Sequence, residues 1–146
     1  MLRGRFGDTT TTPFIEASIH LPRFGISGYV SFLADTGATG TVLMPMDSRR
    51  LGVNFSQLRY PKISRTAGGP ARGYMETGVL GFWDRGTNKI FGFNLEIQIF
   101  EPTRDNTTLP SLLGRDVLNR WRIVIDFSRG AFECTPTSWD HRLNVT

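Results

Sequence analysis

The chain has 146 residues, a formal net charge of +4 and a hydrophobic share of 39%. This length fits one average domain, and the composition excludes collagen and intrinsic disorder. No stretch approaches the roughly 18 consecutive apolar residues of a membrane span, and residues 1–14 hold no apolar run of signal-peptide length, so we expect a soluble, cytoplasmic protein with no membrane partner.

The positive charge is spread along the chain. Of the 17 basic residues 15 are arginine, and Arg49-Arg50 is the only adjacent basic pair. Nucleic-acid binding usually needs a dense basic stripe, so this distribution argues against a nucleic-acid partner. The single cysteine, Cys134, excludes an internal disulfide, and no Cys/His cluster has metal-ligand spacing. We therefore expect neither a metal nor another cofactor.

Frequent threonine, glycine and phenylalanine favour short strands separated by turns, so the expected class is all-β. The threonine-rich start predicts a flexible N-terminal arm over residues 1–13. The next two apolar runs, Phe14–Pro22 and Tyr29–Ala34, are separated by the turn residues 25–28. Together these runs predict a β-hairpin.

The segment after this hairpin predicts a short strand followed by a helical turn. Thr41–Met44 is apolar and β-branched, which predicts a further strand. Pro45 and Asp47 can then start a helical turn that runs through Leu51 and is closed by Gly52.

A second strand pair is expected at Lys62–Arg65 and Tyr74–Trp83. Residues 67–73 between them are rich in glycine and predict a mobile joint. Phe91–Phe100 alternates apolar and polar residues, which is the signature of a half-buried strand.

The C-terminal part predicts the one clear helix and two more strands. Leu109–Gly114 leads into the helix, which is expected over Arg115–Trp121. Arg122–Phe127 and Ala131–Thr135 then predict two strands. No repeat and no linker divides the chain, so we place one domain at 14–135 and a C-terminal tail at 136–146.

One short segment carries a pattern with chemical meaning. Asp35, followed by Thr36, Gly37 and Ala38, comes directly after an apolar strand. A carboxylate in that place loses water and must be matched by hydrogen bonds or by a proton. Gly37 allows a tight turn that brings its N–H to the carboxylate, and the Thr36 hydroxyl can lock a neighbouring segment. A strand-ending Asx turn is the alternative interpretation.

Two motifs in the right order make the chain resemble the retropepsin-like aspartic proteases. Leu33–Ala38 is similar to the family's catalytic hydrophobic-Asp-Thr-Gly-Ala loop. Leu112–Leu118 is similar to its downstream hydrophobic-hydrophobic-Gly-Arg segment with a short helix. The resemblance spans roughly Phe14–Cys134. It implies a small closed β-barrel with one short C-terminal helix, assembled as a two-fold homodimer.

By this resemblance Asp35 is the catalytic residue, and Thr36, Gly37 and Ala38 complete the active-site loop. Aspartic proteases use two carboxylates that share one proton, because the ionised one activates water while the protonated one polarises the scissile carbonyl. The chain has only one Asp-Thr-Gly, so the second carboxylate must come from another copy. The resemblance therefore implies an aspartic endopeptidase that acts on a peptide or protein substrate as a homodimer.

The resemblance also implies a flap and a support for the catalytic loop. The glycine-rich joint lies between the two motifs, where the family carries its flap; an ordinary hairpin loop is the alternative. The support comes from the downstream motif. The flap residues are Gly68, Gly69, Pro70, Ala71, Arg72 and Gly73, and the supporting residues are Leu113, Gly114 and Arg115.

One position departs from the retroviral pattern. Retroviral members often carry an acidic residue directly after Asp-Thr-Gly-Ala, where it pairs with the downstream arginine; this chain has Thr39. The partner of Arg115 is therefore open. Asp116 and Asp126 are candidates by proximity in sequence, and a solvated arginine is the alternative.

Two rival functions belong to other classes. The first is a catalytically silent retropepsin-like dimer that binds a peptide or a partner; the presence of Asp35, Thr36 and Gly37 together argues against it, because such a module has no chemical need for a buried carboxylate pair. The second is a basic β-barrel that binds nucleic acid, against which the scattered arginines argue.

Overall fold

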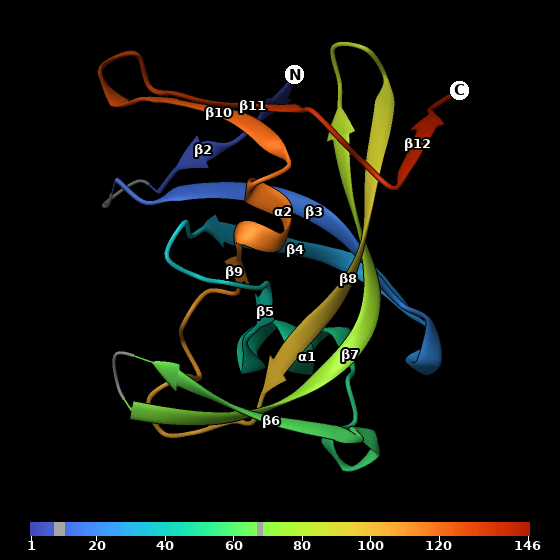
Figure 1. The fold of residues 1–146 in the computed structure, drawn as a ribbon, viewed down its shortest axis with the longest axis vertical. Coiled ribbons are helices and arrows are strands. Elements are labelled where there is room, and N and C mark those ends of the chain that lie inside the picture. Colours follow the sequence, from blue (N-terminus) through green and yellow to red (C-terminus); the bar gives the residue numbers. More distant parts are fainter. Residues whose placement is uncertain (8–10, 67–68) are drawn as a thin grey trace.

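The computed structural model describes residues 1–7, 11–66 and 69–146, and it consists mostly of β-strands (Figure 1). Among the described residues the strands form one nine-stranded sheet and one three-stranded sheet. The larger sheet curls round, and the smaller one lies at the upper end in Figure 1. The predicted all-β class is confirmed.

Six strands of the larger sheet close into a ring. They are β3 (Pro13–Leu21), β4 (Ile26–Ala34), β5 (Val42–Leu43), β7 (Gly69–Asp84), β8 (Lys89–Phe100) and β9 (Leu112–Leu113). Pairing runs in the order β8, β5, β9, β4, β3 and β7, and β7 pairs with β8 to complete the ring. This closure confirms the predicted small β-barrel, and it encloses the main hydrophobic core.

The remaining strands extend the barrel or form the smaller sheet. β2 (Arg5–Phe6) pairs with β3, β6 (Tyr60–Thr66) with β7, and β12 (His141–Asn144) with β8. The smaller sheet has the order β1 (Leu2–Arg3), β11 (Ala131–Pro136) and β10 (Trp121–Asp126). Strand β10 is thus an edge of that sheet.

The short helices connect the strands. They are α1 (Pro45–Leu51), α2 (Arg115–Leu118) and the 3₁₀ turns η1 (Pro22–Phe24), η2 (Phe55–Gln57) and η3 (Phe127–Arg129). Helix α1 has the predicted bounds and ends at Gly52, whose φ of 87° suits glycine. None of the helices in the described part of the chain combines the length and the apolar composition that a membrane crossing requires.

The predicted helix over residues 115–121 is too long. Helix α2 ends at Leu118, and Trp121 is already the first residue of β10. The Trp121 ring packs edge-on against Phe82, with ring centroids 4.7 Å apart. The apolar spacing that predicted one helix therefore combines a helical turn with the start of a strand that points into the same core.

The core comes from the inward faces of the barrel strands. The predicted hairpin is confirmed, since β3 and β4 pair from Phe14 opposite Leu33 to Leu21 opposite Ile26. The alternation predicted for β8 is confirmed on its apolar side, where Phe93, Leu95, Ile97 and Ile99 are buried. Between the barrel and the smaller sheet, the Cys134 side chain is completely buried. The main core thus packs both sheets together, and Val42, Met44 and Phe100 form a second, smaller cluster.

Both chain ends pack on the domain where the structure describes them. Of the predicted flexible arm, Leu2–Arg3 pairs with β11 and Arg5–Phe6 pairs with β3, while residues 8–10 lie outside the described part. Leu2 is only 1% exposed because it faces the core. The predicted tail likewise supplies β12, and the sheets thus extend beyond residues 14 and 135 on both sides.

The strand pair around the glycine-rich joint is longer than predicted. Strands β6 and β7 pair from Tyr60 opposite Met75 to Thr66 opposite Gly69. The prediction of a joint over 67–73 is therefore wrong from Gly69 onward, and residues 67 and 68 lie outside the described part. Near the base of the hairpin, Gly73 also pairs with Phe100 of β8, and this second partner holds a glycine in strand geometry.

Candidate active site

Asp35 lies in the turn that directly follows β4. The Gly37 N–H donates a hydrogen bond to Asp35 Oδ1 at 2.8 Å, and the Ala38 N–H donates to the Asp35 carbonyl at 3.1 Å. The predicted contact between the Gly37 N–H and the carboxylate is confirmed; it has the geometry of an Asx turn. Within the part of the chain that the structure describes, Asp35 Oδ2 accepts no hydrogen bond. Asp35 as a whole is half-buried, so Oδ2 is open to a hydrogen bond from a bound molecule.

The segment around β9 holds this turn from the other side. The Asp35 N–H donates to the Leu113 carbonyl at 3.0 Å, and the Arg115 N–H donates to the Ala38 carbonyl at 2.9 Å. Strand β9 runs parallel to β4, with Leu113 opposite Ala34. The structure thus brings the two sequence motifs together at the end of β4.

Gly114 is required at the point where the two segments cross. A Cβ on Gly114 would lie 2.4 Å from both the carbonyl carbon and the carbonyl oxygen of Gly40. Such a contact is far inside van der Waals distance, and both partners are backbone atoms. The downstream motif therefore needs glycine so that its backbone can approach the loop after Asp35.

Arg115 has a different partner from those expected. Its Nη1 donates to the Thr36 carbonyl at 2.8 Å, and its Nη2 donates to Thr39 Oγ1 at 3.3 Å. The candidates Asp116 and Asp126 are both wrong: Asp116 accepts from Thr41, and Asp126 accepts from Arg129 and Ser128. The arginine thus binds the Asp35 turn directly, through main-chain and hydroxyl oxygens in place of a carboxylate.

The contact between Asp116 and Thr41 is one that sequence reasoning missed. Thr41, which is 1% exposed, donates from its N–H to Asp116 Oδ2 at 3.0 Å and from Oγ1 to Asp116 Oδ1 at 2.8 Å. Thr41 Oγ1 also accepts the Gly114 N–H at 3.2 Å. These three bonds fix the end of the loop that begins at Asp35. Thr41 and Asp116 are 75 positions apart in the chain, so their contact left no signal in the sequence.

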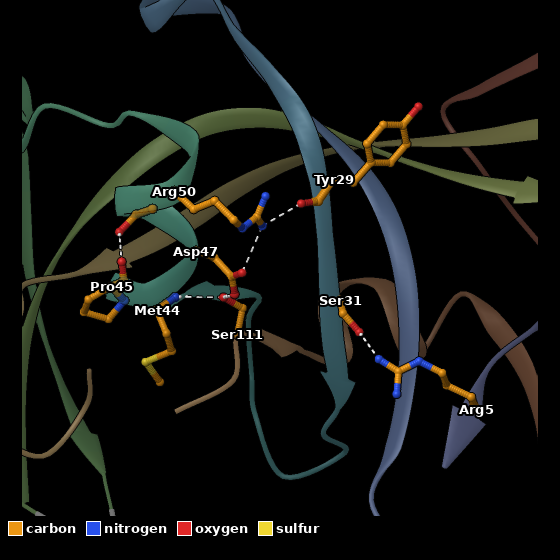
Figure 2. A network of polar contacts seen from close by, with 9 residues as sticks. Arg5, Tyr29, Ser31, Met44, Pro45, Asp47, Arg50 and Ser111 are labelled. Carbon is orange, nitrogen blue, oxygen red and sulfur yellow. Dashed lines mark hydrogen bonds and ion pairs between the residues drawn. The ribbon is translucent and has the colours of Figure 1, made fainter. Parts of the chain in front are cut away.

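A second missed network joins α1, β4 and the segment before β9, and it is drawn in Figure 2. Ser111 Oγ donates to Asp47 Oδ2 at 2.6 Å and accepts the Met44 N–H at 2.9 Å. Arg50 Nη2 donates to Asp47 Oδ1 at 3.0 Å and to the Tyr29 carbonyl at 2.7 Å. Because Ser111 and Asp47 are buried, this network ties helix α1 to β4 and to the approach of β9.

The predicted flap residues lie on the β6–β7 hairpin. Gly69–Gly73 form the first part of β7, and Gly68 lies outside the described residues. In Figure 1 the arrowhead of β6 and the turn after β4 point to the same side of the molecule. At the base of the hairpin, Tyr74 donates to Glu101 Oε1 at 2.7 Å, which raises the pKa of the Tyr74 hydroxyl.

The buried thiol of Cys134 has no role in such chemistry. Its burial raises the pKa of the thiol to about 12, so the thiolate that a nucleophile needs is absent at neutral pH. This agrees with the prediction from sequence that Cys134 is a core residue. Asp35 therefore stays the candidate reactive group of the region where the two motifs meet.

The sequence model of a family described as aspartyl protease matches residues 26–117, which is more than half of the chain and includes the Asp35 turn and Arg115. No curated protein matches the chain.

Among the solved structures that resemble most of this fold are two proteases. A retropepsin-like aspartic protease from Rickettsia conorii matches with a TM-score of 0.56 and 20% identity, over 90% of this chain and 95% of its own. The EIAV protease complexed with the inhibitor HBY-793 matches with a TM-score of 0.50 and 18% identity, over 77% of this chain and 90% of its own. At these identities the likeness concerns the fold.

Proposed function

We propose that this chain, which belongs to the aspartyl protease family, is an endopeptidase whose water nucleophile is activated by two Asp35 carboxylates, one from each subunit of a homodimer. Family membership and the retropepsin-like fold support an aspartic-protease activity in general. The finer proposal is carried by one observation: Asp35 has one oxygen held by the Gly37 N–H and the other free of hydrogen bonds from the described residues.

The proposed reaction needs both carboxylates and one shared proton. The ionised carboxylate accepts a proton from water while the water oxygen attacks the peptide carbonyl carbon, and the protonated carboxylate donates to the carbonyl oxygen. The tetrahedral intermediate then collapses as the C–N bond breaks and the leaving amine takes up a proton. No covalent enzyme intermediate forms. In this proposal Thr36 braces the two loops across the axis, Gly37 lines the site and Ala38 borders the substrate channel.

The edge strand β10 supports a dimer. Opposite Phe132 of β11, the Ile125 side chain is 53% exposed although Phe132 itself is buried, and nearby Phe127 is 58% exposed. The β10–β11 hairpin projects to the same side of the molecule as the Asp35 turn (Figure 1). A second copy that pairs along β10 would cover this apolar end and bring a second Asp35 from the same side.

The flap proposal rests on the β6–β7 hairpin. The described part of the expected flap, Gly69–Gly73, would fold over a bound peptide and exclude water from the carboxylates, which strengthens the electrostatic interactions there. The hydrogen bond from Tyr74 to Glu101 and the 3.6 Å ion pair between Arg72 and Glu101 anchor the hairpin where it leaves the barrel.

The test compares wild type with Asp35→Asn and with the control Asp105→Asn, which removes an exposed carboxylate elsewhere. Each protein is incubated with an unbiased peptide library between acid and neutral pH, and products are identified by mass spectrometry. We expect wild type and Asp105→Asn to cleave alike and Asp35→Asn to be inactive. Equal cleavage by all three proteins would remove Asp35 from the mechanism. Peptide binding without cleavage by wild type would favour the silent binding module.

A dilution series tests the need for a dimer. Specific activity should fall once the protein concentration drops below the dissociation constant of the dimer. Sedimentation measurements at the same concentrations show whether dimers have dissociated. Full activity of a sedimenting monomer would contradict the proposal.

A further inference from the structure

A groove of about 300 Å³ lies on the outer face of the barrel, and the Asp35 turn is not part of its lining. Its walls come from the N-terminal strands on one side and from the end of β7 on the other. The groove forms because the strands that flank β3 on this side do not meet. Strand β3 pairs with β2 only at Pro13 and Phe14, and with β7 only from Ser18 to His20. Among the described residues no strand pairs with residues 15–17 on that side, so the sheet is open there.

Three arginines line this groove, and none of them has a carboxylate partner among the described residues. They are Arg3, Arg5 and Arg85, and all three are exposed. Arg5 Nη2 donates only to the neutral hydroxyl of Ser31, at 3.1 Å (Figure 2). Arg3 lies opposite Glu133 in the strand register but forms no ion pair with it. The groove therefore carries positive charge that the described residues leave unneutralised.

The acidic residue next to Arg85 in sequence does not neutralise it. Asp84 is buried, and its carboxylate accepts from the Met1 ammonium group and from the N–H groups of Gly86 and Thr87. With its carboxylate engaged in these contacts, Asp84 forms no ion pair with Arg85. An anionic ligand is the partner that would complement the groove.

The groove also presents aromatic surface. Tyr29 is 65% exposed and Trp83 is 45% exposed, which is unusual for side chains of this size. The Arg85 guanidinium lies 4.4 Å from the Trp83 ring centroid, and the Arg5 guanidinium lies 5.2 Å from that of Phe14. Stacking on the rings presents the guanidinium groups as flat surfaces that bind a carboxylate and an apolar side chain next to each other.

One residue of the groove, Glu16, favours a peptide over a nucleic acid as its ligand. Glu16 lines the groove and is exposed, and no cation pairs with it in the described part of the chain. Its carboxylate repels a continuous chain of phosphates, whereas a peptide can donate a backbone N–H to it. Mixed charge of this kind fits a ligand that carries both acidic side chains and main-chain donors.

We infer that this groove is a docking site for an acidic segment of a protein substrate, separate from the peptide-bond cleavage site. The inference rests on the proposed function, because the docked segment is taken to be part of what the endopeptidase cleaves. Docking there would raise the local concentration of the attached substrate at the Asp35 pair. It would therefore lower KM for acidic proteins and leave kcat unchanged.

The binding test uses the Asp35→Asn protein so that no probe is cleaved. The probe is a fluorescein-labelled six-residue peptide of aspartate and glutamate with one central phenylalanine, and its isosteric partner contains asparagine and glutamine instead. Fluorescence anisotropy compares this protein with versions that also carry Arg3→Gln, Arg5→Gln and Arg85→Gln together, or the control Arg49→Gln. We expect about tenfold weaker binding of the acidic peptide by the triple variant and no change for the control.

The other outcomes overturn the inference. If Arg49→Gln weakened binding of the acidic peptide as much as the triple variant does, the effect would be one of general charge. If the amide peptide bound as tightly as the acidic one, the groove would not recognise carboxylates. Tighter, arginine-dependent binding of a single-stranded oligonucleotide would assign the groove to nucleic acid. Tyr29→Ser, an exposed change that leaves every arginine in place, should weaken the acidic peptide as well; an unchanged affinity would contradict the role of the aromatic surface.

A kinetic arm separates this inference from the proposed function. The six-residue acidic peptide is joined through a flexible linker to a library peptide that wild type cleaves. KM and kcat for this substrate are then compared between wild type and the triple arginine variant. Cleavage with an unchanged KM would overturn the docking site and leave the endopeptidase standing. Arginine-dependent binding by a chain that cleaves nothing would overturn the endopeptidase and leave the groove as a binding site.

Discussion

The side chain of Arg115 donates a hydrogen bond from Nη1 to the main-chain carbonyl of Thr36 at 2.8 Å. The first turn of α2 thus holds the Asp35 turn through its backbone. A main-chain acceptor keeps its geometry whatever side chain stands at position 36, so the arginine controls the position of the turn itself. The guanidinium group of Arg115 holds its donors in one plane, and its Nη2 also donates to Thr39 Oγ1 at 3.3 Å.

We expect Arg115→Leu to lower kcat/KM for a cleaved peptide by at least about tenfold, because small displacements of reacting groups carry large penalties. Arg115→Lys keeps the positive charge but loses the pair of planar donors that contact Thr36 and Thr39. The activity of this variant should therefore lie between those of Arg115→Leu and wild type. Arg49→Leu removes an exposed arginine and serves as control. Wild-type activity in Arg115→Leu would show that the turn needs no such support.

Gly114→Ala should displace the loop after Asp35. The added methyl group would lie 2.4 Å from backbone atoms of Gly40, and neither segment can rotate it away. We expect a loss of about 1–3 kcal/mol in the free energy of unfolding. We also expect the folded variant to cleave peptide more slowly than wild type, because the displaced loop carries Asp35. Gly86→Ala is the matched control, since its Cβ would meet Asp84 Oδ1 at an ordinary 3.4 Å. Urea unfolding of both variants tests this, and equal stability would contradict the steric argument.

Ser111→Ala should destabilise the protein by about 1–3 kcal/mol. The change removes a donor to the buried carboxylate of Asp47 and an acceptor for the Met44 N–H, and it leaves both groups without that partner. Ser128→Ala removes a hydrogen bond from exposed Ser128 to Asp126 and should change the unfolding free energy by less than about 0.5 kcal/mol. Similar unfolding curves for the two variants would mean that water replaces the Ser111 hydroxyl.

Ile125→Asp should weaken the proposed dimer. The side chain is 53% exposed on the edge strand β10, so the substitution places a charge where a second copy would bury apolar surface. We expect sedimentation to show at least about tenfold weaker association, with activity falling in parallel. Leu143→Asp, on β12, places a charge at another exposed apolar residue and should leave the dimer intact. A dimer that resists Ile125→Asp would move the interface elsewhere.

The stability contribution of Asp140 should depend on pH. Hydrogen bonds from Arg120 and from the Asn94 N–H lower the pKa of the Asp140 carboxyl. A lowered pKa in the folded state adds stability that is present above the unfolded pKa of about 3.9 and is lost as the pH falls through the folded value. Asp140→Asn should therefore cost about 0.5–1 kcal/mol at pH 6.5, and the difference from wild type should shrink toward zero in strong acid. Chemical unfolding at several pH values measures this, and a difference that grows in acid would contradict it.

Local patterns in the sequence predicted most of the longer strands, whereas the barrel and the role of the downstream motif followed from the resemblance to a known family, and β9 was expected only as a lead into the helix. The alternation in Phe91–Phe100 and the glycine at position 114 each reflect a constraint that acts at one place in the chain. The Arg115 acceptor could not be predicted, because a main-chain carbonyl has no sequence signature. The contact between Thr41 and Asp116 joins residues 75 positions apart, and only the folded barrel brings them together.

The errors at the chain ends and at the β6–β7 hairpin have a common cause. Two-residue strands such as Leu2–Arg3 are too short to show alternation, so their pairing with β11 depends on the barrel that is already formed. In β7, Gly69, Pro70 and Gly73 have low strand propensity, yet the long register with β6 overrides it. In both places tertiary pairing decides the conformation.

The sheltered thiol of Cys134 has a practical consequence. It is the only cysteine in the chain, it is completely buried, and its pKa of about 12 makes it unreactive toward maleimides at neutral pH. A cysteine introduced at an exposed position such as Arg65 would then be the sole site that takes a spin label, without any need to replace the native one. If the proposed dimer forms, pulsed electron paramagnetic resonance on that variant would measure the distance between the labels on its two β6–β7 hairpins, with and without a bound peptide.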